Sequence, residues 1–191
     1  MSNNINKEDF DNSFEHYKEV LESKDSKKME ELSTLYKNTF PNDIGDYFTY
    51  QDRSITLLEK AVECTTDTKI LIKTGDTKRY GTDYDGKYPR KALELYKRAA
   101  DLGDCEAMMK IVSMYENEFS EENTNYKKSL YWIRKAIAKQ YPPSFYKLGC
   151  YYDEGKGVSQ NSDHAYDLWE KGEKLGDDNC ICRLHPFSSY Y

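Results

Sequence analysis

The stretch "YKLGCYYDEGKGVSQNSDHAYDLWEKGEKLG", Tyr146 to Gly176, decides the fold. Its Gly-Lys-Gly run invites comparison with a phosphate-binding loop, which requires the pattern G-x-x-x-x-G-K-[ST] between a strand and a helix. Here a helical pattern precedes the glycines, and Lys156 lies between them. The run is therefore predicted to be a corner between two helices and not a phosphate site.

Each residue of this corner has a structural role in that interpretation. Gly155 ends one helix, and Gly157 supplies a backbone turn without the penalty of a Cβ atom. Val158 is expected to pack inward, and Asn161 or Ser162 to cap the next helix. The corner thus predicts two antiparallel helices joined by a loop.

The same pattern occurs three times. Segments that begin at Lys91, Lys128 and His164 align with offsets of 37 and 36 residues. Small, bulky, cationic and small residues recur in the same order, and a turn position follows each segment. The aligned columns are Ala92, Ser129 and Ala165; Tyr96, Ile133 and Trp169; Arg98, Lys135 and Lys171; Ala99, Ala136 and Gly172; and Gly103, Gln140 and Gly176. The last column predicts the end of a helix.

A second helix follows each turn and has one apolar face. Its small first column is Ala107, Ser144 and Cys180. Positions 0, +1, +4, +5 and +8 from that column fall on one side of a helix. They are Ala107, Met108, Ile111, Val112 and Tyr115 in one repeat, and Ser144, Phe145, Leu148, Gly149 and Tyr152 in the next. Such a hairpin cannot bury its apolar side alone, so neighbouring hairpins are expected to stack.

The pattern extends towards the N-terminus with looser matches. Residues 54–65 supply a first helix with Leu58 at the bulky position, and residues 70–81 supply its second. Earlier still, Phe14, Tyr17 and Leu21, then Leu32 and Tyr36, have helical spacing. About ten helices in five hairpins are expected. Residues 39–51, with Pro41 and Gly45, and residues 82–89, with Gly86 and Pro89, are predicted to be the long connectors.

These motifs resemble the Sel-1-like repeat, a relative of the tetratricopeptide repeat. The resemblance rests on Leu148, Gly149, Tyr152, Gly155, Gly157, Val158, Ala165, Trp169, Lys171 and Gly176. It is weaker in the two preceding repeats, where the Gly-x-Gly-Val corner is missing after Tyr115, and Thr74 and Lys78 replace the usual Leu and Tyr. The resemblance implies an all-α fold, a right-handed α-α superhelix or solenoid, that holds partner proteins.

The repeats suggest a division of the chain. Residues 1–66 form a divergent helical cap or degenerate repeats, residues 67–103 a degenerate repeat, and residues 104–140 and 141–176 two further repeats. Residues 177–191 form a capping helix and tail, in which Phe187, Tyr190 and Tyr191 either fold back or allow self-association.

Composition excludes several classes of protein. The 191 residues carry a formal charge of -6, which disfavours nucleic acid as a partner. No signal peptide and no apolar run long enough to span a bilayer is visible, so a cytoplasmic protein is expected. The five cysteines, Cys64, Cys105, Cys150, Cys180 and Cys182, fit reduced thiols better than a disulfide framework or a zinc site.

No catalytic, metal or cofactor site emerges from the motifs. The three histidines, His16, His164 and His185, fall in different repeats without ligand spacing. The acidic pairs at residues 121–122 and 177–178 lie in predicted turns, where capping or solvation is their expected role. We expect no cofactor and no enzyme activity.

A column of cations is the candidate binding feature. Position +3 of the second helices is Lys73, Lys110, Lys147 and Arg183, and the adjacent +2 column is Ile72, Met109, Tyr146 and Cys182. By resemblance, the second helices line the concave side, which implies a groove for a protein or peptide, acidic on one edge. The predicted binding residues are Lys73, Met109, Lys110, Tyr146, Lys147 and Arg183. The alternative is a solvated face with partly packed +2 residues.

Three functions therefore remain open. A non-catalytic adaptor, a monomer or a weakly self-associating protein, is favoured because a repeat scaffold lacks convergent polar groups. An enzyme resembling cysteine-rich repeat proteins linked to β-lactam binding or hydrolysis is second, although those have paired cysteines in each repeat. A self-assembling structural component is third.

Overall fold

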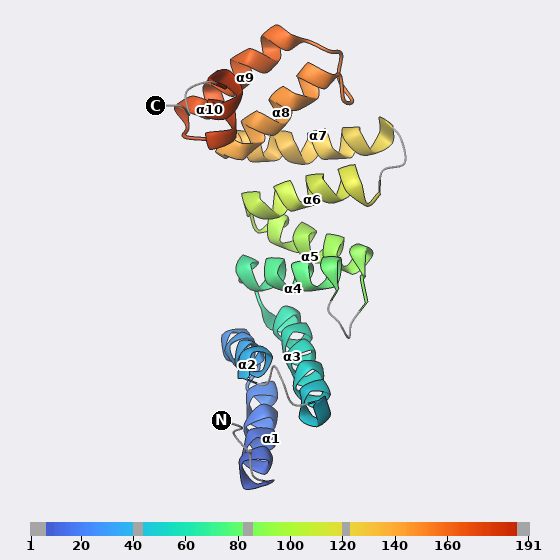
Figure 1. The fold of residues 1–191 in the computed structure, drawn as a ribbon, viewed down its shortest axis with the longest axis vertical. Coiled ribbons are helices and arrows are strands. Elements are labelled where there is room, and N and C mark those ends of the chain that lie inside the picture. Colours follow the sequence, from blue (N-terminus) through green and yellow to red (C-terminus); the bar gives the residue numbers. More distant parts are fainter. Residues whose placement is uncertain (1–6, 40–43, 82–85, 120–122, 187–191) are drawn as a thin grey trace. The chain divides into compact units, whose positions relative to one another are not determined.

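The computed structural model describes residues 7–39, 44–81, 86–119 and 123–186, and within these ranges all regular structure is α-helical (Figure 1). The described residues form ten helices, as the repeat pattern predicts. They are α1 (Lys7–Glu22), α2 (Ser26–Thr39), α3 (Ile44–Cys64), α4 (Thr68–Tyr80), α5 (Pro89–Asp101), α6 (Cys105–Asn117), α7 (Asn123–Ala138), α8 (Pro142–Glu154), α9 (Ser162–Lys174) and α10 (Asp178–Leu184).

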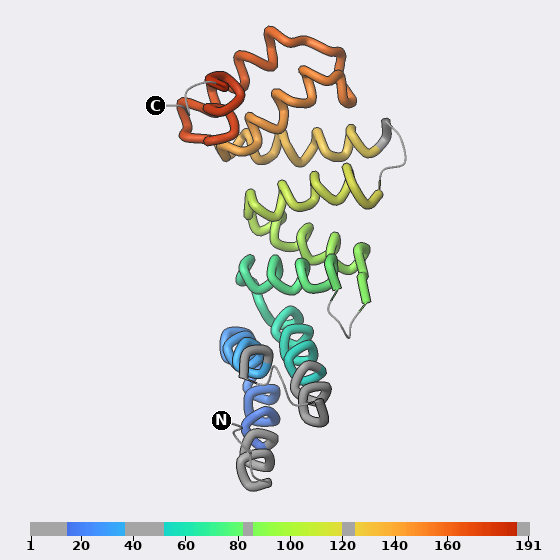
Figure 2. Tube along the Cα trace, in the orientation of Figure 1, coloured from blue at the N-terminus to red at the C-terminus, as the bar shows by residue number. Residues whose placement is uncertain are grey.

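The chain consists of two compact units, Met1–Leu95 and Tyr96–Tyr191. In the first unit α2 packs on α3, and α3 contacts α4. In the second unit α6 packs on α7, α7 on α8, and α9 on both α8 and α10. Most of these contacts join helices that are consecutive along the chain traced in Figure 2, and α1 also contacts α3, as α8 contacts α10.

The small and bulky columns of the repeat are the core of the second unit. Ala99, Ala136 and Gly172 are buried, and so are the bulky Tyr96, Ile133 and Trp169. The small first column of the second helices, Ala107, Ser144 and Cys180, is fully buried. Small side chains at these positions allow neighbouring helices to approach closely, and large ones fill the space beside them. The predicted apolar face is confirmed, with Tyr152 only half-buried.

The corners within the hairpins share one hydrogen-bond pattern. The backbone N–H groups of Asp104, Tyr141 and Asp177 donate to the carbonyls of Ala99, Ala136 and Gly172, each five residues back. The residue before each donor, Gly103, Gln140 or Gly176, has a positive φ of 98°, 56° or 84°. This is the arrangement in which a left-handed residue closes a helix. The predicted helix ends are therefore confirmed as equivalent turns.

Gln140 is the one residue of this column with a side chain, and it provides a stability test. A non-glycine residue in the left-handed region is strained, whereas glycine is not, although glycine costs more chain entropy on folding. We expect Gln140→Gly to raise the free energy of unfolding by about 0.5 kcal/mol. Urea denaturation followed by tryptophan fluorescence measures the change. A loss of stability would contradict this account of the turn.

The Gly-Lys-Gly corner has the predicted turn and helix cap, whereas Val158 is only half-buried. Gly155 follows the last residue of α8 with φ 70° and ψ 26°, the left-handed conformation. The Asn161 side chain accepts a hydrogen bond from the backbone N–H of His164 and caps α9. A Cβ atom on Gly157 would come within 2.8 Å of Tyr126 Cβ and 3.2 Å of Leu130 Cδ1, so this corner lies directly against α7.

One connector prediction is wrong. Residues 39–51 were expected to interrupt the helices, but α3 already begins at Ile44 and includes Gly45. Gly45 lies in the first turn, where the backbone N–H groups have no intrahelical partner, so a glycine there does not break the helix. The other connector is confirmed, since α4 ends at Tyr80 and α5 begins at Pro89.

The first unit has its own core. Its buried residues come from α1 to α4 and include Tyr36, which contacts Tyr17 with 6.3 Å between ring centroids. Of the residues predicted to hold this region together, Phe14 has a side chain outside the described residues. The core consists of Val20, Met29, Leu32, Tyr36, Leu57, Ala61 and Ile70. The loose helical spacing near the N-terminus therefore does correspond to packed helices.

Candidate partner-binding groove

The four predicted cations are bound within the protein, three of them to another helix. Lys73 in α4 lies 2.8 Å from a Glu30 carboxylate oxygen in α2, and its ammonium group also donates to Thr34. Arg183 in α10 lies 2.8 Å from Asp153 in α8 and 4.8 Å from the Trp169 ring centroid. These cations join helices of neighbouring hairpins.

Lys147 belongs to the most enclosed of these contacts. Its ammonium nitrogen is 2.7 Å from Glu116 Oε2, and the other oxygen of Glu116 accepts a 2.7 Å hydrogen bond from the Tyr151 hydroxyl. The Glu116 side chain is 15% exposed, and Tyr151 is buried. Burial, together with the bond to Glu116, raises the pKa of Tyr151 above its ordinary value, so the phenol remains a donor. The group links α6 to α8.

Lys110 differs from the other three cations. Its ammonium group is 3.7 Å from Glu106, one turn earlier in the same helix, and 5.9 Å from the Tyr96 ring centroid. An exposed pair at i, i+4 contributes only a few tenths of a kcal/mol. The column of cations therefore contains three ion pairs between helices and one ion pair within a helix.

A groove in the second unit contains three of the six predicted binding residues. It has a volume of about 550 Å³, and Met109, Tyr146 and Lys147 line it. We call it the α6–α8 groove. Its remaining walls are Ser113, Glu116, Asn117, Tyr126, Pro143 and Lys156. Lys110 and Arg183 belong to the same unit but do not line it.

The side chains of the groove differ in how free they are to meet a partner. Tyr146 is half-buried and packs against the cluster of Ala165, Trp169 and Cys180, and its carbonyl accepts a hydrogen bond from the Trp169 indole at 3.2 Å. Met109 is half-buried. Of the remaining +2 residues, Ile72 is buried and Cys182 is exposed. Met109 and Pro143 are thus half-buried apolar side chains that line the groove.

Within the described residues, no three His, Cys, Asp or Glu side chains are grouped so that they could hold a metal ion. His185 lies 2.9 Å from Glu173, and the His164 ring stacks edge-on against Tyr152. Asp177 caps α10 by accepting from the Cys180 N–H, which is the predicted role of that acidic pair. Residues 121–122 and the tail aromatics Phe187, Tyr190 and Tyr191 lie outside the described residues.

All five cysteines lie in described segments and are free thiols. Cys64 and Cys182 are exposed, whereas Cys180 is fully buried. Burial and the hydrogen bond to Asp177 raise the pKa of Cys180 to about 12.

We therefore expect iodoacetamide at pH 8 to label Cys64 and Cys182 rapidly in the folded protein and Cys180 only after unfolding, because the thiolate is the reactive form. The unfolded thiol loses its proton at lower pH than the folded one, so above about pH 9 this group lowers the stability. Peptide mass spectrometry reads out the labels. Rapid labelling of Cys180 in the folded protein would contradict this assignment.

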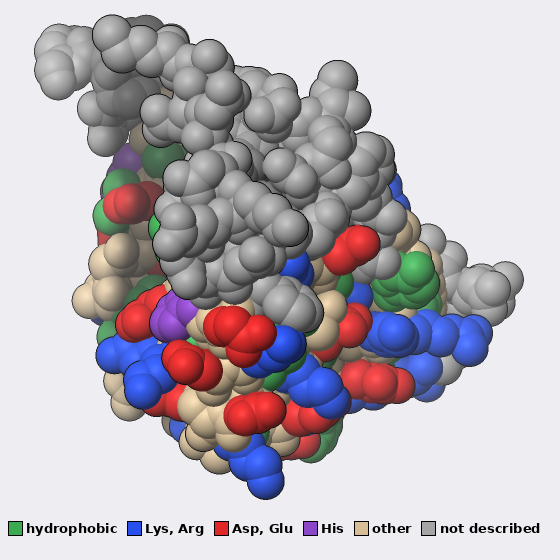
Figure 3. All heavy atoms as spheres, turned by 90° about the horizontal axis from the view of Figure 1, so that it is seen from below, with side chains coloured by type: hydrophobic (Ala, Val, Ile, Leu, Met, Phe, Trp, Pro, Cys, Tyr) green, Lys and Arg blue, Asp and Glu red, His purple; other side chains and the backbone are tan. Residues whose placement is uncertain are grey.

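Among the described residues, no helix is both long and apolar enough to cross a lipid bilayer. On the face drawn in Figure 3, acidic and basic side chains are interleaved. The described surface in that view thus lacks the continuous basic area typical of nucleic-acid binding.

Repeated helix hairpins, equivalent turns and buried small-residue columns define the class of α-helical repeat proteins. More particularly, the family model of the Sel1 repeat matches residues 75–104, 112–141 and 144–177, and the chain belongs to the Sel1 repeat family. Proteins built from Sel1 repeats generally act as scaffolds for protein interactions.

Solved structures support the fold. A Sel1 repeat protein from Oxalobacter formigenes is 22% identical, with a TM-score of 0.67 over 86% of this chain and 64% of that one. The protective antigen c5321 of uropathogenic Escherichia coli, described as having an SLR fold, is 20% identical, with a TM-score of 0.66 over 89% of this chain and 35% of that one. These likenesses establish a helical-repeat solenoid fold.

Two fungal proteins are similar in sequence. Chitin synthase regulator SKT5 of Saccharomyces cerevisiae is 27% identical over 108 residues, which are 54% of this chain and 15% of that protein. Chitin synthase regulatory factor 3 of Schizosaccharomyces pombe is 26% identical over 99 residues, 49% of this chain and 11% of that protein. The chain matches only a small part of the length of both relatives.

Proposed function

We propose that the protein is a non-catalytic adaptor and that it binds a peptide segment of a partner protein in the α6–α8 groove. The observation that carries the proposal is the groove of about 550 Å³ in a fold whose family consists of interaction scaffolds. The names of the two fungal relatives support it, because a regulator acts on another protein.

The chemistry of the groove favours a partner segment of mixed character. Met109 and Pro143 offer apolar contact, and Ser113 and Asn117 offer hydrogen-bonding groups. Lys147 is already neutralised by Glu116 at 2.7 Å, so a partner carboxylate would have to compete with an internal one. We therefore propose that an apolar side chain at Met109 contributes more to the affinity than acidity does.

A crosslinking experiment tests the proposal. A photoreactive amino acid is placed at Met109 in the groove, and in a control protein at Tyr166, an exposed aromatic position of α9. In cells of the producing organism, irradiation is expected to join the Met109 protein to a discrete partner and the Tyr166 protein to none. The same crosslinked products from both positions would contradict the assignment of the groove as the binding site.

The identified partner then permits a binding measurement. Met109→Glu is expected to weaken binding at least about tenfold, because it puts a charge at a contact that is apolar and buried in the complex. Tyr166→Glu is expected to leave binding unchanged. A thermal denaturation profile checks that both variants remain folded. If Met109→Glu kept its affinity for the partner, the α6–α8 groove would be rejected as the binding site. The adaptor function itself would not be rejected by this result.

A further inference from the structure

Helix α7 has an unusual charge distribution. It carries Lys127, Lys128, Arg134 and Lys135 and contains no Asp or Glu, in a chain whose net charge is -6. Its cations form two pairs separated by seven residues, which is close to two helical turns. Corresponding members of the two pairs therefore lie on the same side of the helix.

The four cations of α7 fall into two groups. Lys128 lies 5.5 Å from the Tyr115 ring centroid. Lys135 lies 4.7 Å from the Trp132 ring centroid and 3.9 Å from an oxygen of Asp101. Lys127 and Arg134 are exposed and have no ion pair, hydrogen bond or ring contact to any residue that the structure describes. In this respect they differ from the cations of the predicted column, which all have carboxylate partners.

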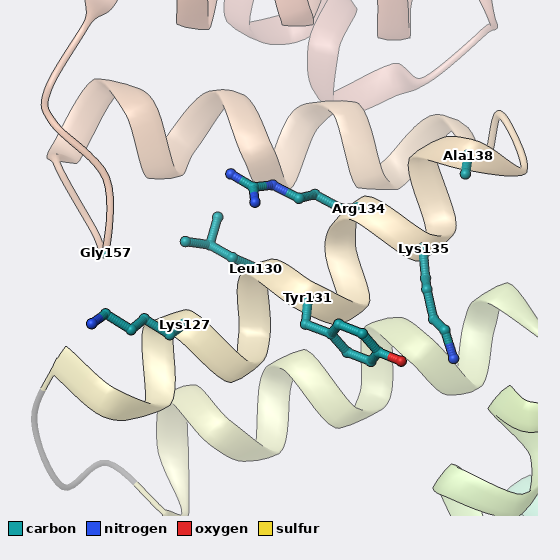
Figure 4. A pocket seen from close by; sticks show the side chains of 7 residues that line it. All are labelled: Lys127, Leu130, Tyr131, Arg134, Lys135, Ala138 and Gly157. Carbon is teal, nitrogen blue, oxygen red and sulfur yellow. The ribbon is translucent and has the colours of Figure 1, made fainter.

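A cleft lies beside the two unpaired cations (Figure 4). It has a volume of about 520 Å³ and is bounded by α7 and by the corner that contains Gly157. In the close-up, the side chains of Lys127, Leu130 and Arg134 extend on the side where Gly157 lies, with the leucine between the two cations. Its complete lining is Lys127, Leu130, Tyr131, Arg134, Lys135, Ala138 and Gly157.

The walls between the cations are apolar: Leu130 is buried against the Gly157 corner with its edge at the cleft, and Tyr131 is exposed. Tyr131 is 56% exposed, and its ring stacks edge-on against Trp132 with 5.2 Å between centroids. The Gly157 corner is held against α7, because even a Cβ atom there would collide with Tyr126. The cleft is thus a preformed apolar depression with a positive charge towards each end.

We propose that this α7 cleft is a second interaction site, separate from the α6–α8 groove, and that it binds a short acidic peptide segment of a partner protein. Two carboxylates of the segment pair with Lys127 and Arg134, about 10 Å apart along the helix axis, and an apolar side chain between them rests on Leu130 and Tyr131. In a polyproline II segment, residues i and i+3 lie on the same side about 9 Å apart, which matches this spacing.

Charge complementarity favours a peptide over a nucleic acid. Of the cations that line the cleft, Lys127 and Arg134 are the two without a partner among the residues that the structure describes, and the surface between them is apolar. A polyanion would extend beyond the cleft and be repelled by the acidic remainder of the chain, whereas a two-carboxylate segment lies within one screening length of the local cations.

Fluorescence anisotropy with the full-length protein tests the proposal. The probe is an end-capped, rhodamine-labelled peptide with the core Glu-Pro-Leu-Glu, and its neutral counterpart has the core Gln-Pro-Leu-Gln. We expect saturable binding of the acidic peptide, at least about tenfold weaker binding of the neutral peptide, and a loss of affinity with added salt. Absence of saturable binding by the acidic peptide would overturn the proposal.

A matched pair of variants locates the site. Lys127→Glu with Arg134→Glu reverses the two unpaired cations, and Lys171→Glu with Lys174→Glu changes the net charge equally at exposed positions of α9. The first double variant is expected to lose at least about tenfold in affinity and the second less than twofold. Equal losses of peptide affinity in the two double variants would show that the effect depends on net charge alone. They would reject the cleft as the binding site. If a single-stranded oligonucleotide bound at the same residues more tightly than the acidic peptide, the cleft would be a nucleic-acid site. That result would also reject the peptide proposal.

Discussion

Replacement of Gly149 by alanine is expected to lower the free energy of unfolding of the second unit by about 3 kcal/mol. In an exposed helix the same change would stabilise by about 1 kcal/mol, so the expected sign is reversed. The reason is the Trp169 indole, which packs on the α8 backbone: a Cβ atom on Gly149 would lie 2.2 Å from its Nε1 atom and 2.6 Å from Cδ1. The indole would have to leave its hydrogen bond to Tyr146.

Urea denaturation of the Gly149→Ala protein measures this loss. Both tryptophans of the chain, Trp132 and Trp169, belong to the second unit, so their fluorescence reports on that unit alone. Gly176→Ala is the matched control, because Gly176 has a φ of +84° and no atom within 4 Å of the added Cβ. It should cost only the backbone strain, about 1 kcal/mol. Similar losses for the two variants would argue against the indole contact.

Removal of the Glu116 side chain is the second large expected effect, a loss of about 2–3 kcal/mol for Glu116→Ala. The carboxylate has two partners at 2.7 Å, the Lys147 ammonium and the buried Tyr151 hydroxyl. Without it, the Lys147 ammonium loses its carboxylate and the buried Tyr151 hydroxyl loses its acceptor at the contact between α6 and α8. The measurement is again the urea transition of the tryptophan fluorescence.

Glu106→Ala provides the comparison for Glu116→Ala. Glu106 is 63% exposed, and among the described residues its ion-pair partner is Lys110, at 3.7 Å within the same helix. Its removal should cost no more than about 0.5 kcal/mol. A double variant that adds Tyr151→Phe to Glu116→Ala is expected to recover part of the lost stability. The second change removes the buried hydroxyl group whose acceptor was Glu116. If both glutamate variants were equally stable, Glu116 would be an ordinary surface residue.

The hairpins could be predicted from the sequence because the repeated residues are the ones that pack between neighbouring helices. A small residue at Ala99, Ala136 or Gly172 is dictated by a close neighbour, and the same neighbour recurs 36 or 37 residues later. The start of α3 could not be predicted in this way, since Gly45 acts as a breaker in a helix interior but is tolerated in a first turn.

For Lys73, Lys147 and Arg183, the carboxylate that neutralises the cation lies in another helix. Lys147 and Arg183 occupy position +3, and their carboxylate partners Glu116 and Asp153 occupy position +9 of the preceding repeat. Position +9 was available in the alignment, but the predicted groove considered only the +2 and +3 columns. Comparison of neighbouring columns across successive repeats would have identified these ion pairs.

The α7 cleft was not predicted, although a signal for it was present. The absence of Asp and Glu between residues 123 and 138 is visible in the sequence. That Lys127 and Arg134 are the unpaired members of the helix follows only from the placement of Tyr115, Asp101 and Trp132 beside the other two. Charge composition thus indicates the helix, and packing selects the residues.

The equivalence of the turns at Gly103, Gln140 and Gly176 has an evolutionary consequence. Because each turn ends in the same five-residue hydrogen bond, a duplicated gene segment of 36 or 37 residues would insert one whole hairpin in phase with its neighbours. An insertion of another length inside a helix would turn the residues that follow it in that helix to a different side and expose part of the apolar face. Gain or loss of whole hairpins is therefore the change in length that keeps the stacked core intact.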